Sequence, residues 1–417
     1  MQYFLFLFYF VLILIIISKS KFLKESDLGV KVIIVLFSLK VLVGFFYGYY
    51  YSLPEQEFKA DTLAYFNESK IETDWLLKNP KTFFADLFTN HYTQTGNLFS
   101  CTNSFWNDLK ATFFIKALAV LNLLSNKNYY INILFLNLFF LYGTISFYRL
   151  FKENFKNNKW VLLVFVFLTP SFLFWCSGIH KDGVVFASTA ICFYSFQKII
   201  QKQAGIKLFA VLIICLTLIF LLRNYYLLAI APSLFAWFVV AKYKLNAKYT
   251  FGSVIFVCLL FLFFSNAFSI TNSISNSIVE KHNEFLKLEG NTKFYPPSLE
   301  NNTASFIAYF PYALQSALFR PFPANTKSLP EFLAMIENYL LIILIIFSLI
   351  VAFVKRKSIL SSPILLACLT TSFLLLLFIG YTVCFDAAIV RYRSVSFPLL
   401  LVPSIIILFA KNKSAVK

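Results

Sequence analysis

The stretch MQYFLFLFYFVLILIIISKS, residues 1–20, decides the fold class of this chain. Its residues 2–18 carry no charge and are almost all apolar. At a rise of about 1.5 Å per residue, such a run is long enough to cross a bilayer as a helix. The stretch has neither a positively charged start nor a small-residue cleavage site, which distinguishes it from a secretory signal peptide. We therefore expect a retained membrane helix.

The rest of the chain has the same character. Hydrophobic residues make up 59% of the 417 residues and aromatic residues 20%, against 13% charged, and the mean hydropathy is +0.73. No water-soluble domain of this length has such a composition. We predict an all-α, polytopic integral membrane protein that forms a single membrane domain over residues 1–417. Its transmembrane helices, about eleven in number, are expected at 2–18, 30–50, 129–149, 160–176, 183–199, 206–222, 225–241, 250–270, 337–354, 361–382 and 394–410.

The positive charges predict the orientation of these helices. The net charge is +18, and lysines gather in every second connection. Because cytoplasmic loops carry the excess of Lys and Arg, we place the N-terminus outside, the C-terminus inside, and two long segments, 51–128 and 271–336, outside. No basic run is interleaved with exposed aromatics, which argues against a nucleic-acid partner. The clusters are Lys19, Lys21, Lys24 and Lys31; Arg149, Lys152, Lys156 and Lys159; Lys198, Lys202 and Lys207; Lys242, Lys244 and Lys248; Lys355, Arg356 and Lys357; and Lys411, Lys413 and Lys417.

The apolar run ATFFIKALAVLNLL, residues 111–124, conflicts with this scheme, because a twelfth crossing would place the cluster at 149–159 outside. We therefore expect an interfacial helix on the outer side, from which Lys110, Lys116 and Lys127 extend to the lipid headgroups. A second interfacial helix is expected over TLAYFNESKIETDWLL, residues 62–77.

Arginine is used differently from lysine in this chain. Only six of the 37 basic residues are arginines, and four of the six fall on the predicted outer side. A guanidinium is planar and grips a carboxylate or phosphate with two parallel hydrogen bonds, whereas an ammonium is a mobile point charge. The four outer arginines are Arg223, Arg320, Arg391 and Arg393.

The three separated arginines among them fit a diphosphate leaving group, with Arg393 in support of its neighbour. The alternative is that they pair with outer acids such as Asp386 or Glu331, or with the phosphate of outer-leaflet lipid.

The connection TPSFLFWCSGIHKDG, residues 169–183, gathers polar groups in a short hairpin between two predicted spans. His180 is a candidate general base, with mere solvation as the alternative. Asp182 is a second candidate base, and its alternative role is to cap the following helix. Lys181 is a cation on the outer side and a further candidate ligand of the diphosphate.

Asp61 is the leading candidate for the base. It follows the second span in FKADTLAYFNES, residues 58–69. Glycosyl transfer needs a base, or a metal-held carboxylate, to draw the proton from the attacking hydroxyl. The alternative is that Asp61 caps the helix expected at 62–77. Lys40, inside the second span, either faces a cavity or partner or extends to the cytoplasmic headgroups.

The sequence lacks the residues that several other enzymatic activities require. The seven cysteines include no Cys-x-x-Cys pair, and His91 and His282 stand alone, which argues against a zinc hydrolase. Neither a Gly-rich phosphate loop nor a Gly-x-Ser-x-Gly elbow occurs. An O-acyltransferase usually relies on a buried histidine, and none of the three histidines lies in a predicted span. No cofactor is expected, and the use of a divalent metal stays open.

Four motifs carry a resemblance to a known class of protein. They are Asp61-Thr62-x-x-Tyr65, PSFLFWCSGIHKD at 170–182, LFRPFP at 318–323, and RYR at 391–393 followed by Pro398. In this order the chain resembles bacterial O-antigen or exopolysaccharide repeat-unit polymerases and, more loosely, the GT-C class of polyprenyl-phosphate-dependent glycosyltransferases.

The resemblance implies an enzyme of the bacterial inner membrane that binds a lipid-linked glycan in a cavity open to the outer face. Asp61 would correspond to the catalytic acid and Arg391 to the arginine near the carrier phosphate. Thr62 departs from the second acid that GT-C enzymes often have, which puts a metal-dependent mechanism in doubt. The expected partners are a polyprenyl-diphosphate-linked glycan, membrane lipid and other polysaccharide-assembly proteins. The alternative function is a transporter or flippase of the same glycans.

Overall fold

The computed structural model describes residues 2–53, 61–89, 104–155, 158–202, 205–268, 273–354 and 362–409. Within these ranges the chain is helical and contains no strand, with one isolated β-bridge between Lys293 and Phe385. Its residues fall into two compact units. Unit 1 comprises Met1–His91 and Asp108–Arg223, and unit 2 comprises Tyr92–Asn107 and Asn224–Lys417. The single membrane domain stays a prediction. His91, Cys101, Lys156 and the basic clusters at 355–357 and 411–417 lie outside the described residues.

Nine helices of the described ranges are long and apolar enough to cross a membrane, as expected for a multi-pass membrane protein. A helix satisfies all its interior backbone groups within one segment, which the hydrocarbon of a bilayer demands. Unit 1 holds α1 (Gln2–Lys19), α3 (Val30–Tyr51), α7 (Tyr129–Phe151), α10 (Lys181–Ile200) and α11 (Ile206–Arg223). Unit 2 holds α12 (Tyr225–Tyr243), α13 (Ala247–Phe264), α16 (Leu329–Val354) and α17 (Pro363–Thr382).

Two predicted spans differ from single straight helices. The run at 160–176 forms α8 (Lys159–Phe167) and α9 (Pro170–Trp175), because proline disfavours a helical residue before it and can itself begin a new helix. The run at 394–410 forms α19 (Phe397–Phe409), which meets α18 (Asp386–Ser394) at a bend of 59°. The RYR motif therefore lies within a helix, not in a loop.

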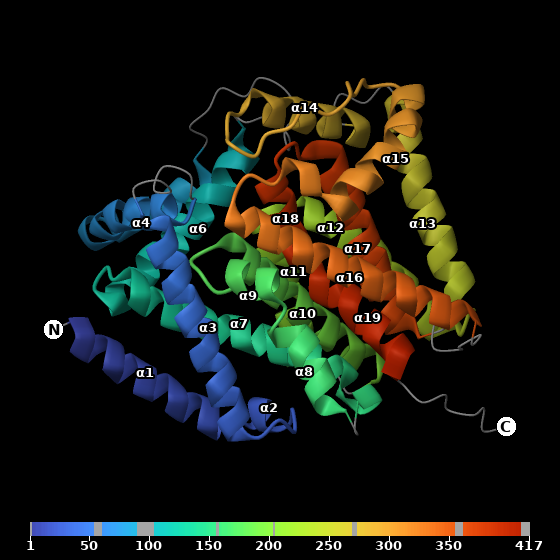
Figure 1. Cartoon of the computed structure of the whole chain (residues 1–417). Helices are drawn as coiled ribbons and strands as arrows, with labels where there is room; N and C mark the ends of the chain where they lie inside the picture. Colours follow the sequence, from blue (N-terminus) through green and yellow to red (C-terminus); the bar gives the residue numbers. More distant parts are fainter. Residues whose placement is uncertain are drawn as a thin grey trace. The chain divides into compact units, whose positions relative to one another are not determined.

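Unit 1 is built around α10, which packs against α7 on one side and α11 on the other (Figure 1). α3 crosses α7 and also contacts α9. The predicted helices of the first long segment are confirmed as helices, α4 (Asp61–Lys78) and α6 (Phe105–Ser125). Shorter elements complete the unit: α2 (Lys21–Lys24), α5 (Pro80–Ala85), the 3₁₀ turn η2 (Asp86–Phe88) and the 3₁₀ turn η3 (Lys152–Phe155).

Lys116 of α6 does not extend to the lipid headgroups as expected. Lys116 is buried, and its Nζ lies 2.7 Å from Glu72 Oε2 and 3.0 Å from Asp86 Oδ2. Lys127, just after α6, pairs with Asp74 at 2.6 Å. The expectation was wrong for Lys116, because acids of α4 and η2 lie within reach and a buried cation needs such partners. For Lys110 and Lys127 it stays a prediction.

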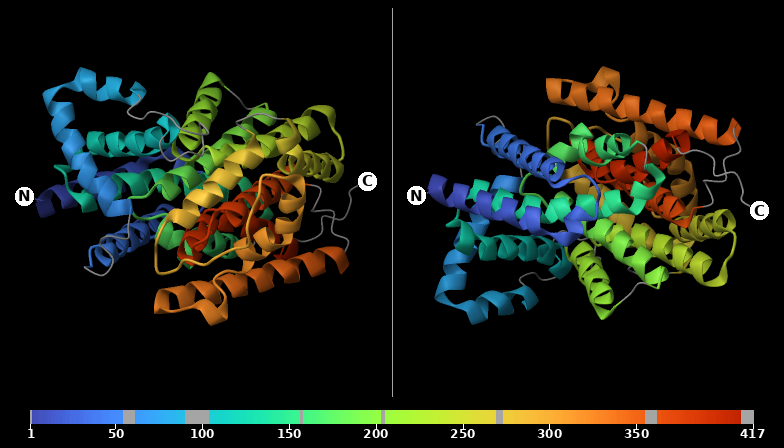
Figure 2. Two further views of the ribbon diagram at one scale, coloured as in Figure 1. Left: turned by 90° about the horizontal axis from the view of Figure 1, so that it is seen from above. Right: turned by 90° about the horizontal axis from the view of Figure 1, so that it is seen from below.

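Unit 2 is built around α17, which contacts α12, α14, α15 and α19. The segment expected as an outer loop at 271–336 contains α14 (Ile274–Lys287), α15 (Thr303–Phe319), the 3₁₀ turn η5 (Pro323–Asn325) and the first turns of α16. A further 3₁₀ turn, η4 (Ser265–Phe268), follows α13. Figure 2 shows α16, in orange, along the edge of this unit. Most of its surface is uncovered by protein, which suits contact with lipid.

Candidate functional site

Five of the eight predicted site residues come together in unit 1. They arrive from three separate parts of the chain, because Asp61 begins α4, His180 to Asp182 begin α10, and Arg223 ends α11. α10 and α11 are neighbours joined by a short connection, so the start of α10 lies beside the end of α11. Lys181 completes the group.

Arg223 and Asp182 form the buried end of this site. Arg223 Nη2 lies 2.6 Å from Asp182 Oδ1, and the Asp182 side chain is fully buried. A buried carboxylate requires such a partner, because desolvation of an isolated charge is very costly. The guanidinium of Arg223 is thus engaged by protein, which is the alternative that the sequence left open for the outer arginines. Asp182 is not the cap of α10, since His180 holds the N-cap position.

His180 connects the buried pair to the exterior. Its Nδ1 lies 2.8 Å from Asp182 Oδ2 and 3.3 Å from the Asp182 backbone N. The two contacts require opposite protonation of Nδ1, and the shorter one decides, since two unprotonated acceptors at 2.8 Å would repel each other. Nδ1–H therefore donates to Asp182, and Nε2 carries the lone pair. Within the described ranges this buried Nε2 has no hydrogen-bond partner.

Asp61 forms the exposed end of the site. Its Oδ2 lies 3.6 Å from His180 Nε2, which is longer than a hydrogen bond, and its side chain is 46% exposed. Asp61 also begins α4, so it favourably faces the positive end of that helix as well. Both groups are acceptors, so a hydroxyl that approaches them donates its one proton to either His180 Nε2 or the Asp61 carboxylate. The arrangement can therefore take a proton from a bound hydroxyl, with Asp182 fixing the tautomer of the histidine.

Lys181 places a cation next to the exposed end of the site. The side chain is 8% exposed, and its Nζ lies 4.4 Å from the centre of the Tyr65 ring. Tyr65 stands one turn after Asp61 on α4. α4 and the start of α10 thus meet at the site through an aromatic face and a cation, an attractive geometry.

Lys40 holds the turn that carries His180. It is 2% exposed, and its Nζ donates to Cys176 O at 2.9 Å, the carbonyl at the end of α9. Of the two roles that the sequence left open for Lys40, the structure shows contact with a partner inside the protein. Asn137 of α7 donates to the next carbonyl, Ser177 O, at 2.7 Å. Gly44 lies against the same oxygen, where a Cβ would come within 2.5 Å.

Unit 2 contains the other three arginines. Arg320 Nη1 lies 3.1 Å from Asp386 Oδ1, and its guanidinium stacks on the Phe294 ring at 3.5 Å. This pairing is again the alternative foreseen from sequence. Arg391 is half-buried, and its Nη2 lies 3.1 Å from the hydroxyl of Tyr392.

Arg393 completes the end of α15. It is 1% exposed, and its Nη1 donates to Ala317 O at 2.8 Å and Leu318 O at 2.9 Å. The last carbonyls of a helix have no partner within the helix, so this cation satisfies them. Arg393 therefore has a structural role in unit 2, and direct contact with a ligand is not available to the Nη1 edge of its guanidinium.

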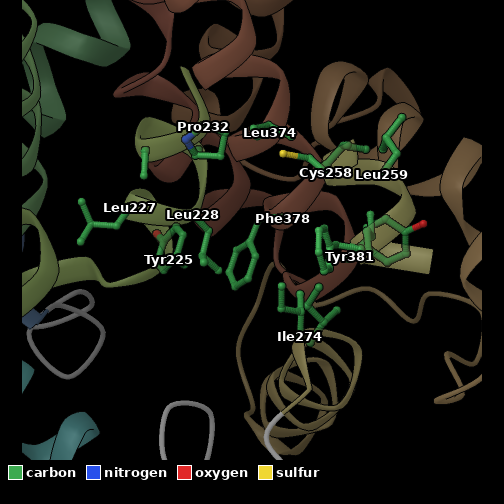
Figure 3. Close-up of a pocket in the computed structure, with 16 residues that line it drawn as sticks. Tyr225, Leu227, Leu228, Pro232, Cys258, Leu259, Ile274, Leu374, Phe378 and Tyr381 are labelled. Atoms are coloured by element: carbon green, nitrogen blue, oxygen red, sulfur yellow. The ribbon is translucent and has the colours of Figure 1, made fainter. Parts of the chain in front are cut away.

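A separate apolar pocket lies in unit 2 between α12, α13, α14 and α17 (Figure 3). Its volume is about 320 Å³, and hydrocarbon forms nearly all of its wall. Tyr225 and Phe378 stack at 4.6 Å on one side, and Cys258, Ile274 and Tyr381 line the rest. Apolar cavities of this kind exclude water and accept hydrocarbon.

Comparison with known proteins does not identify a relative. The chain matches no family model, no curated protein and no solved structure. Among the described residues, no three His, Cys, Asp or Glu side chains are grouped as a metal site.

Proposed function

We propose that the protein is a membrane glycosyltransferase of the polysaccharide-polymerase type. It transfers a sugar or oligosaccharide from a polyprenyl-diphosphate carrier to an acceptor hydroxyl during cell-surface polysaccharide synthesis. The observation that carries this proposal is the buried Nε2 of His180, oriented by Asp182 and 3.6 Å from the exposed carboxylate of Asp61. His180 Nε2 is a proton acceptor next to the exposed side chain of Asp61, from which side a hydroxyl can approach.

The reaction needs one proton transfer and one displacement. The acceptor hydroxyl binds beside Asp61 and donates to His180 Nε2, which removes its proton. The oxygen attacks the anomeric carbon, the bond from that carbon to the diphosphate breaks, and its electron pair leaves with the diphosphate. Asp182 stabilises the imidazolium that forms, and Arg223 holds Asp182 in place.

The leaving diphosphate requires positive charge, because preorganised cations stabilise charge that develops in the transition state. Lys181 is the cation of unit 1 that we assign to this role. For Arg391 of unit 2, contact with the carrier phosphate is what the resemblance of the RYR motif implies. Arg223 and Arg320, first predicted to bind the diphosphate, we reassign to holding Asp182 and Asp386. The apolar pocket of unit 2 is the proposed seat of part of the carrier's hydrocarbon chain.

The proposed topology has eleven crossings in a bacterial inner membrane. They comprise the nine apolar helices, the bent pair α18–α19 and the broken pair α8–α9. With the N-terminus outside, the starts of α4 and α10 and the end of α11 all fall on the outer face, where the carrier's glycan is used.

The test is chain growth in detergent by the purified full-length protein with a polyprenyl-diphosphate-linked repeat unit. We expect the wild type to produce longer glycans and His180→Ala and Asp61→Asn to produce none. Arg391→Lys should strongly decrease glycan lengthening, because lysine keeps the positive charge but lacks the planar guanidinium that makes two parallel hydrogen bonds. Asp74→Asn is the control, since it removes an exposed carboxylate from the same helix α4. If wild type never lengthens the glycan, or if His180→Ala remains active, the proposal fails.

The second candidate function is transport of the same lipid-linked glycan. Two observations favour it: Lys40 is a buried cation at the middle of α3, and two of the predicted spans are broken helices. Transporters place charges and helix breaks at this depth. Vesicles that contain the protein decide between the two, because a transporter moves the labelled lipid between leaflets without lengthening its glycan.

A further inference from the structure

The hydroxyl of Tyr129 touches both halves of the site in unit 1. It lies 2.8 Å from Thr62 Oγ1, and it has a second hydrogen bond with the backbone of Ile179. Thr62 directly follows Asp61, and Ile179 directly precedes His180. One oxygen therefore contacts the chain neighbour of each group that lines the gap.

The ring of Tyr129 is itself held in place. It is the first residue of α7 and is 8% exposed. It packs edge to face with the ring of Phe66 on α4, with ring centres 5.2 Å apart and planes at 90°. On α3, Gly48 provides the space for the ring, because a Cβ at that position would overlap Tyr129 Cε1.

These contacts couple the start of α4 to the turn before α10, beside the contact of Lys181 with Tyr65. The turn before α10 is fixed on its other side by Lys40 and Asn137. At the start of α4, the side chains of Thr62 and Tyr65 make contacts at the site. The Tyr129 hydroxyl supplies a polar contact of this kind.

We infer that Tyr129 is a positioning residue, whose hydroxyl ties Thr62 to Ile179 and so sets the spacing between Asp61 and His180. This inference deepens the proposed function and rests on it for the effect on turnover, but the geometry can be tested without activity. Loss of the hydroxyl should let the start of α4 move, widen the gap and expose Nε2. A misplacement of about 1 Å is enough to lower turnover about a hundredfold.

The experiment is carbethoxylation of His180 by diethyl pyrocarbonate in the full-length protein, followed by mass spectrometry of the peptide that carries it. Tyr129→Phe removes only the hydroxyl. Tyr130→Phe is the matched control, because Tyr130 is the next residue of α7, is exposed, and packs its ring on Phe45. Thr62→Val removes the same hydrogen bond from the other side, and Thr62→Ser retains it.

We expect faster labelling of His180 in Tyr129→Phe and Thr62→Val, and wild-type rates in Tyr130→Phe and Thr62→Ser. The double variant of Tyr129→Phe and Thr62→Val should label no faster than Tyr129→Phe alone, since the hydrogen bond lost in Thr62→Val is already lost in Tyr129→Phe. Where chain growth is measurable, kcat should fall with KM unchanged. Wild-type labelling in Tyr129→Phe overturns the inference. If the labelling changes as expected but the wild-type protein never lengthens glycan, the positioning role of Tyr129 is supported and the glycosyltransferase proposal fails.

Discussion

Lys40 shows what a single charge does inside an apolar helix. Its ammonium donates to Cys176 O within a protein interior, so its removal leaves a buried carbonyl without a donor. We expect Lys40→Met to lower the free energy of unfolding by about 2 kcal/mol, the scale of a buried hydrogen bond to a charged group. Thermal unfolding in detergent measures this. Lys31→Met is the control, because Lys31 lies in the exposed first turn of the same helix. Equal melting temperatures for the two variants would contradict the assigned contact.

The pair of Asp182 and Arg223 makes a second prediction at this scale. Arg223→Gln leaves a buried carboxylate without its cation and should destabilise the protein by about 3–5 kcal/mol. The double variant with Asp182→Asn removes both charges and should be more stable than Arg223→Gln alone. Melting temperatures of the two single variants and the double variant give this coupling. A double variant that is as unstable as the sum of the single ones would show that the charges do not pair.

Sequence alone indicated some of these residues and not others, for a physical reason. Ionisable groups are costly in apolar runs, so Asp61, His180, Asp182 and Arg223 stood out, and the structure brings them together. Tyr129 and Asn137 did not stand out, because an uncharged residue in an apolar helix gives no sign of whether it faces lipid, a neighbouring helix or a site.

The elements of unit 2 define the pocket, and filling it tests its proposed role. Leu374 of α17 lines the pocket, whereas Leu366 lies two turns earlier on the same helix and does not. We expect Leu374→Trp to raise KM for the lipid-linked substrate and leave kcat nearly unchanged, because the added ring occupies space that the hydrocarbon chain would use. Leu366→Trp should leave KM as in wild type. A KM that both substitutions change equally would show that the effect comes from distortion of α17.

α14 carries a histidine whose titration should be visible in stability. His282 is buried, and its Nδ1 donates to Tyr381 O at 2.9 Å. Burial lowers the pKa of His282 below its ordinary value of 6.5, an effect that the hydrogen bond to Tyr381 only partly offsets. The unfolded chain therefore binds the proton first, so stability should fall as the pH drops below about 6.5 and level off below the folded pKa.

The measurement is the melting temperature between about pH 7.5 and about pH 5. His282→Asn retains a donor for Tyr381 O but does not titrate, so it should lose less stability than wild type over this range. Identical slopes for the two proteins would exclude a contribution from His282.

The helices show where sequence patterns succeed and where they stop. Length and apolarity predicted the nine helices of the described ranges that are able to cross a membrane, because a bilayer demands such runs. The break between α8 and α9 was missed, although Pro170 marks it, since mean apolarity continues across the proline. α18 was missed because DAAIVRYRS is short and charged. Which helices pack against each other could not be predicted, because a helix that is apolar on all sides has no distinct apolar face to indicate its neighbour.

At the scale of the whole molecule, the decisive question is whether the pair α8–α9 crosses the bilayer. Its 17 residues from Lys159 to Trp175 span about 25 Å if fully helical, close to the thickness of the hydrocarbon core. Yet the end of α9 contacts Lys40, which is at the middle of the 22-residue α3, and this contact would also suit a re-entrant pair.

Single cysteines in a background without the native ones distinguish the two. Asn158, Lys242 and Asn301 are all exposed and suit labelling. If α8–α9 crosses, four crossings separate Asn158 from Lys242, so Asn158→Cys and Lys242→Cys should react with an impermeant maleimide from the same, cytoplasmic side of sealed vesicles. Asn301→Cys, beyond α13, should react from the other side. If the pair turns back, only three crossings remain and the first two positions should label from opposite sides. The positive charges favour the first result, because it alone keeps the basic clusters near 152–159 and 242–248 together on the cytoplasmic side.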